Sequence, residues 1–101
     1  MIEILIQKEY DQTVPFTYKT NSYTIRLFSW QGFILADIKK GDEYIVAGIL
    51  CTNNTNIVQG EGKIKGNFRL VNTSDDDNYP NVNGLGDKYK LYYITPEEIE
   101  E

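Results

Sequence analysis

The sequence predicts an all-β fold, namely a small single-domain β-barrel or β-sandwich of about seven short, mostly antiparallel strands. Three observations favour this fold. Apolar and polar residues alternate with a period of two in several segments, and pairs of turn-forming residues separate these segments at short intervals. No stretch shows the 3.6-residue apolar period of a helix. Because a single sheet would leave one apolar face in water, the strands are expected to close around a core.

A meander of three strands forms the centre of the pattern. Tyr23–Trp30 alternates regularly, so that Leu27 and every second residue around it share one face. The tight turn Gln31-Gly32 follows, and Phe33–Lys39 and Tyr44–Thr52 continue the meander. We therefore expect three neighbouring antiparallel strands joined by hairpin turns.

Two residues mark irregular places in these strands. Pro15 lies in a predicted strand and has no backbone N–H to donate, so that strand is expected at a sheet edge. Gly48 lies inside an apolar strand, at a place where a sheet can bend sharply.

The other strands flank the meander. They are a run around Ile2–Ile6, Thr13–Thr20 with the turn Asn21-Ser22 after it, the short segment Ile57–Gln59, Asn67–Asn72 and Lys88–Ile94. Between the last two lies Thr73–Asp87, a long loop rich in turn residues. Thr95–Glu98 has the residues of a helix start, but so few residues follow that we expect a frayed turn. The expected domain is 1–95, followed by a short acidic C-terminal tail at 96–101.

Composition excludes several classes of protein. The chain has 101 residues, which suits one domain, and its apolar runs are far shorter than the roughly 20 residues of a membrane-spanning helix. The N-terminus lacks the basic region of a signal peptide, so synthesis in the cytoplasm is expected. With 15 acidic and 10 basic residues, the chain is also not expected to bind nucleic acid, because phosphate contacts need clustered Lys and Arg.

The sequence offers little for catalysis or for binding a cofactor or metal. It contains no histidine, the usual general base near neutral pH. Cys51 ends an apolar strand and is expected to be a buried hydrophobic residue. Asp37 is expected either on the solvent face or paired with Arg26 on the neighbouring strand. The loop Asp75–Asp87 is rich in Asp and Asn but does not fit the EF-hand template, so a solvated loop is expected instead of a calcium site.

The aromatic residues are the stronger functional signal. Thirteen percent of the chain is aromatic, and Trp and Tyr are enriched where two proteins meet. The candidate interface residues are Trp30, Phe33, Tyr89, Tyr92 and Tyr93. Capping of the ends of a barrel is the equally simple structural interpretation.

Two further functions stay open at this stage. The same aromatic residues suit a small binding module of the OB or carbohydrate-binding type, in which they stack on a base or sugar. A hydrolase without histidine, using Asp and Glu pairs that include Asp37, is the third candidate.

Several short motifs resemble a known family. They are the start Met-Ile-Glu-Ile, Tyr23-x-x-Arg26-Leu27-x-x-Trp30, Gly32-Phe33-x-x-x-Asp37-Ile38, Gly48-x-Leu50, and Pro80…Leu85-Gly86…Leu91-Tyr92-Tyr93. Over about residues 1–94 the chain is similar to the small baseplate plug proteins of tailed bacteriophages. It departs from that family at Asn53–Asn56, where an apolar run is more usual, and in the additional acids at Asp75–Asp77 and at the C-terminal tail.

The resemblance implies a structural component of the virion tail baseplate, without catalysis or cofactor, at the distal end of the tail tube. The implied partners are the baseplate hub and spike and the tail tube proteins. Copies would follow the three-fold or six-fold symmetry of the tail, with unpaired strand edges as one way to join chains.

Overall fold

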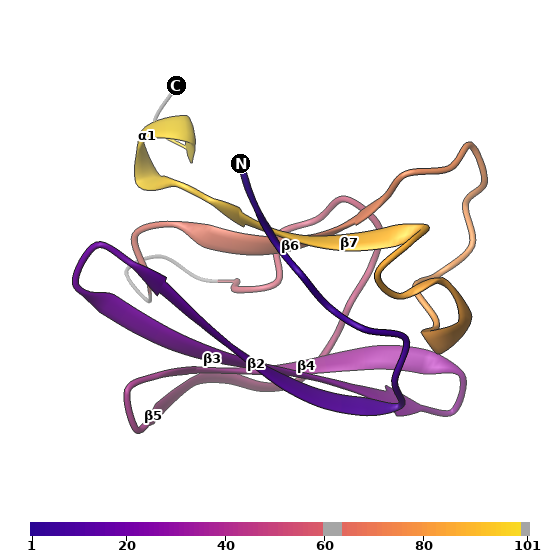
Figure 1. Ribbon diagram of the computed structural model, residues 1–101, viewed down its shortest axis with the longest axis horizontal. Helices are drawn as coiled ribbons and strands as arrows, with labels where there is room; N and C mark the ends of the chain where they lie inside the picture. Colours follow the sequence, from indigo (N-terminus) through magenta and orange to yellow (C-terminus); the bar gives the residue numbers. More distant parts are fainter. Residues whose placement is uncertain (60–63, 100–101) are drawn as a thin grey trace.

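The described residues form two antiparallel sheets that face each other. The computed structural model describes residues 1–59 and 64–99, and the two sheets enclose one core (Figure 1). The four-stranded sheet contains, in this spatial order, β2 (Asp11–Tyr18), β3 (Asn21–Trp30), β4 (Phe33–Lys40) and β5 (Glu43–Leu50). The three-stranded sheet contains β1 (Ile2–Ile4), β7 (Tyr89–Ile94) and β6 (Asn67–Asn72). The all-β prediction is confirmed, and within the described chain the architecture is sandwich-like instead of a closed barrel.

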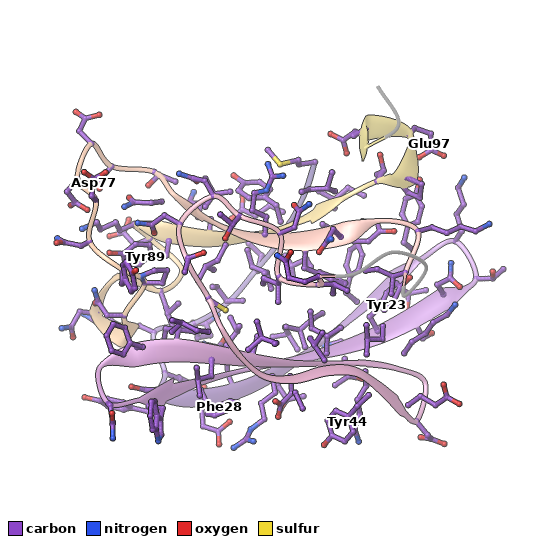
Figure 2. All side chains as sticks on the ribbon, turned by 180° about the vertical axis from the view of Figure 1, so that it is seen from behind. Tyr23, Phe28, Tyr44, Asp77, Tyr89 and Glu97 are labelled. Atoms are coloured by element: carbon purple, nitrogen blue, oxygen red, sulfur yellow. The ribbon has the colours of Figure 1, made fainter. Side chains whose placement is uncertain are left out.

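The core lies between the two sheets and takes the faces that the sequence predicts. Leu27 on β3 and Leu91 on β7 are both fully buried, and so are Ile25 on β3 and Tyr89 and Tyr93 on β7, which share their faces. Figure 2 shows Tyr23 pointing into the space between the sheets. The buried residues of the central strands are Tyr23, Ile25, Leu27, Ile34, Ala36, Ile38, Phe68, Leu70, Tyr89, Leu91 and Tyr93.

The turns of the meander follow local backbone chemistry. Gln31 and Gly32 both have positive φ, 49° and 84°, as a type I′ hairpin turn between β3 and β4 requires. The turn between β2 and β3 is Lys19-Thr20, so the predicted turn Asn21-Ser22 is wrong by two residues. The reason is the register, because Phe16 pairs directly with Tyr23 and both rings join the core.

Both edges of the four-stranded sheet are irregular. β2 forms one edge and contains Pro15, as the sequence predicts. β5 forms the other edge, and its pairing with β4 shifts register between Ala36 and Ile38 and again between Ile38 and Lys39. Gly48 lies at the first shift with φ 65°, and its N–H donates to the Asp37 carboxylate at 2.6 Å. The predicted bend at Gly48 is therefore a β-bulge, held by a side chain of the neighbouring strand.

The predicted strand Ile57–Gln59 is wrong. The segment passes along β6 with one isolated bridge, Asn56 to Arg69, and a backbone bond from Ile57 N to Phe68 O. At Val58 the Asn67 side chain takes both backbone bonds, accepting from N at 3.0 Å and donating to O at 2.8 Å. The side-chain amide of Asn67 thus takes the place of the next backbone-to-backbone pair, and strand pairing ends there.

Thr95–Glu98 also differs from the expected frayed turn. A single helical turn, α1 (Pro96–Ile99), begins after Thr95. The Glu98 carboxylate accepts from Thr95 N at 3.0 Å and from Thr95 Oγ1 at 2.9 Å, and the Met1 amine binds it at 2.6 Å. These bonds give the polar groups of Thr95 at the start of the helix their hydrogen-bond partners, which explains why so short a segment is helical. Residues 100–101 of the expected acidic tail lie outside the described residues.

No helix in the described ranges is long and apolar enough to cross a membrane.

The core assignment predicts a contrast among leucines. Leu27→Ala or Leu91→Ala should lower the free energy of unfolding by about 2–5 kcal/mol, because each empties a fully buried site. Leu5→Ala is the matched control, because this leucine is 78% exposed and should change stability by less than about 0.5 kcal/mol. Urea melts measure all three, and a loss under about 1 kcal/mol at both buried sites would contradict the proposed core.

Candidate interaction surface

The outer face of the four-stranded sheet carries a group of apolar side chains at one end. We call it the aromatic surface, and it consists of Phe28, Trp30, Phe33, Leu35, Leu50 and Tyr79. The strand register brings its members together, because Trp30 pairs with Phe33, Phe28 with Leu35, and Leu35 with Leu50. Figure 2 shows Phe28 on the side of this sheet that faces away from the core.

The surface is open to solvent although it is apolar. Trp30 is 54% exposed, Leu50 43% and Phe33 37%. Tyr79 comes from the long loop before β7 and packs edge-on against Phe33, with ring centroids 5.6 Å apart. Exposed aromatic side chains that gather on a rigid sheet are typical of a protein contact.

The five candidate residues of the sequence do not lie on one face. Trp30 and Phe33 are neighbours on the aromatic surface. Tyr92 lies on the outer face of the three-stranded sheet, opposite Glu3 and Arg69, and is half-buried. Tyr89 and Tyr93 are buried between the sheets, with exposed fractions of 0% and 1%. In the folded chain these two tyrosines are core residues, so only Trp30 and Phe33 contribute to the aromatic surface.

Four members of the surface were not among the candidates. Phe28 and Leu35 share the outward parity of Trp30 and Phe33, so the two-residue period of their strands contains the signal that locates them. The sequence alone does not assign Leu50 to this face, because its orientation depends on the register shifts of β5. Tyr79 is in a loop, where no periodicity indicates which residues meet.

A polar region continues the same face away from the aromatic surface. It forms a small pocket of about 140 Å³ lined by Thr13, Thr24, Arg26, Asp37, Lys39 and Tyr44. Arg26 Nε and Nη2 donate to the two carboxylate oxygens of Asp11 at 3.0 and 2.7 Å, and Nη1 donates to Asp37 at 3.5 Å. The bond to Arg26 holds the pKa of Asp11 below its usual value, and the bond to Asp11 raises the pKa of Arg26.

These contacts confirm the predicted cross-strand pair of Arg26 and Asp37. The second oxygen of Asp37 accepts the Gly48 N–H, so this carboxylate both pairs with a cation and holds a bulge. A carboxylate engaged in this way stabilises the sheet and is poorly placed to accept a proton from a substrate.

The acidic loop before β7 is held together by its own side chains. Asp76 pairs with Lys88, and the same carboxylate accepts from Asn72 Nδ2 at 3.2 Å and from Asn78 N at 3.1 Å. The bond to Lys88 is the main reason why the pKa of Asp76 lies well below its usual value. Among the described residues, no three Cys, Asp or Glu side chains come together as a metal site would require.

Comparison with protein families gives a match over nearly the whole chain. The family model described as cyanophage baseplate Pam3 plug gp18 matches residues 1–97. No curated protein matches the chain.

The burial of Cys51 predicts slow thiol chemistry. Cys51 is 2% exposed, and burial raises its pKa to about 12. The thiolate is the reactive form of cysteine. Iodoacetamide at pH 8 should therefore modify the folded chain far more slowly than the chain unfolded in about 8 M urea. Mass spectrometry over time follows the reaction. Fast modification of the folded chain would show that this strand end is open.

The ion pair of Asp76 predicts a dependence of stability on pH. The folded-state pKa of Asp76 is lowered, so its contribution is fully present above the unfolded value of about 3.9 and is lost as pH falls through the folded value. Asp76→Asn should therefore lower the urea midpoint at pH 7, and its difference from the parent should shrink below about pH 4.

The neighbouring substitution Asp75→Asn is the control for this experiment. Asp75 is exposed, and its carboxylate makes no hydrogen bond or ion pair with the described residues. The Asp75→Asn substitution should leave the urea midpoint nearly unchanged at every pH. An equal effect of the two substitutions would indicate general charge repulsion instead of a specific pair.

Proposed function

Because the chain belongs to the cyanophage baseplate Pam3 plug gp18 family and is thus a phage baseplate plug protein of the virion tail, we propose that it is a non-catalytic plug at the distal end of the tail tube. In this position it contacts the hub and spike proteins of the baseplate and helps to keep the tube closed until infection. The single observation that carries the proposal beyond the family is the aromatic surface on the outer face of the four-stranded sheet.

The aromatic surface supports a docking role because of its position. Trp30 and Phe33 flank a tight type I′ turn, so two hydrogen-bonded strands hold their backbones in place. A side chain held on a rigid element loses less freedom on binding than one on a mobile loop. Such a surface suits permanent attachment to a large assembly.

The absence of catalysis is supported by the engagement of the candidate reactive groups. Asp37 is bonded to Arg26 and to Gly48 N–H. Cys51 is buried, and the sequence has no histidine to activate it. These two candidate reactive side chains, Asp37 and Cys51, therefore serve the fold.

The geometry also favours one mode of assembly over another. Copies that each dock on the same site of the hub acquire the three-fold or six-fold symmetry of the tail without contacting one another extensively. Joining through strand edges is less suitable in the four-stranded sheet, because one edge contains Pro15 and the other is bulged at Gly48. We therefore favour side-chain docking through the aromatic surface.

Electron microscopy of the phage particle tests this function. Particles that contain the chain should show additional density at the distal end of the tail tube compared with particles made without its gene. The density should return when the gene is supplied separately, which controls for indirect defects. Baseplates with identical density in the two preparations, or density found only elsewhere on the tail, would contradict the proposal.

A further inference from the structure

The loop before β7 contains a 3₁₀-helical turn, η1 (Val82–Gly84), that is anchored to the core. Gly84 is buried, and Leu85 directly after it is 2% exposed. Asn83 lies in the middle of the turn and is exposed to solvent. The turn therefore presents one asparagine to water from a backbone that its neighbours hold in place.

The residue after this asparagine has to be glycine. A Cβ at Gly84 would lie 2.6 Å from both Cδ2 and Cε2 of the Tyr89 ring, which is too close for any other residue. Figure 2 shows Tyr89 at the end of the molecule from which Asp77 projects. The side-chain amide of Asn83 makes no hydrogen bond with the described residues, and the pair is the one Asn-Gly pair of the sequence. Packing on Tyr89 thus places a glycine directly after an exposed asparagine.

An Asn-Gly pair loses ammonia without the help of an enzyme. The glycine backbone nitrogen gives up its proton and attacks the carbonyl carbon of the asparagine side chain. A C–N bond forms that closes a five-membered succinimide ring, and the bond to the side-chain nitrogen breaks, so that this nitrogen leaves as ammonia with the proton. Water then opens the ring at either carbonyl and gives aspartate or isoaspartate. Glycine favours the attack because no side chain hinders its backbone.

The turn itself opposes the attack. Gly84 N–H donates to Asn81 O at 3.2 Å, and Asn83 N–H donates to Asn81 Oδ1 at 3.1 Å. A 3₁₀ backbone has ψ of about −20 to −30°, which turns the next nitrogen away from the side chain of the residue before it. The ring can therefore close only after the turn opens. Such local opening occurs in folded proteins and costs less free energy than global unfolding.

We propose that Asn83 is a site of spontaneous deamidation whose rate is set by local opening of η1. The reaction consumes only water and is independent of the proposed position at the tail tube. A virion makes no new protein, so the products accumulate with the age of the particle. Isoaspartate adds one carbon to the backbone before Gly84 and displaces this residue against the Tyr89 ring, where not even a Cβ has room.

The turn also supports one member of the aromatic surface. Asn81 Nδ2 donates to Tyr79 O at 3.1 Å, and the Tyr79 ring packs on Phe33. The isoaspartate product at Asn83 should therefore loosen the loop that carries Tyr79.

Timed incubation of the full chain at mildly alkaline pH tests the proposal. Peptide mass spectrometry, after separation of aspartate from isoaspartate peptides, follows each asparagine. Asn83 should react first, and it should react at least about tenfold faster in the chain unfolded by urea, where no opening is needed. Equal rates in the folded and unfolded chain would overturn the proposal, as would an earlier reaction of the folded chain at another asparagine.

Two variants separate local opening from global unfolding. Asn81→Ala removes the side-chain bond to Asn83 N–H at the start of the turn, so deamidation of the folded chain should become about fivefold faster. Asn56→Ala is the matched control, because it removes the bonds to Arg69 and none within η1. It should leave the rate at Asn83 unchanged. If the rates of both variants follow only their urea midpoints, global unfolding sets the rate and the proposal fails.

The product itself provides a further readout. Asn83→Asp has the added charge of one product without the extra backbone carbon, and it should keep the urea midpoint of the parent chain. The isoaspartate fraction, purified from aged protein, should unfold at lower urea because its turn no longer fits against Tyr89. An isoaspartate fraction as stable as the parent would overturn the proposed effect on the turn.

Discussion

The packing of aromatic rings around Tyr93 holds the two sheets together, and the rest of the structure depends on it. The Tyr93 ring on β7 lies 5.0 Å from the rings of Phe16 and Tyr18 on the opposite sheet and 5.2 Å from that of Phe68 beside it. Gly66 leaves the space for this ring, because a Cβ there would collide with the Tyr93 hydroxyl. Since these rings occupy the interior, the aromatic residues of the outer face have no core left to join.

Most of the fold is predictable from the sequence because it depends on which face of each strand is apolar. The period of two places Leu27 and Leu91 in the core, and the missing N–H of Pro15 locates an edge. The two-residue period does not determine the register in which neighbouring strands pair. The turn at Lys19-Thr20 and the side-chain bonds of Asn67 that end pairing near Val58 both depend on partners distant in the chain.

The candidate surface is predictable only in part, for a related reason. Trp30 and Phe33 flank a turn that the sequence identifies, so their proximity follows from the hairpin. The composition of β7 shows that tyrosines cover both faces, but which face is internal is settled by the opposite sheet, and that sheet buries Tyr89 and Tyr93. Tyr79 reaches Phe33 from a loop of irregular backbone, and no local pattern encodes that contact.

The bulge at Gly48 has a consequence for the life of the protein before it joins a virion. A flat, unbroken border on a sheet lets separate chains pair edge to edge and polymerise into fibrils. The Asp37 carboxylate fixes the irregular backbone there by accepting the Gly48 N–H, so the same carboxylate that pairs with Arg26 also opposes edge-to-edge growth of fibrils at β5.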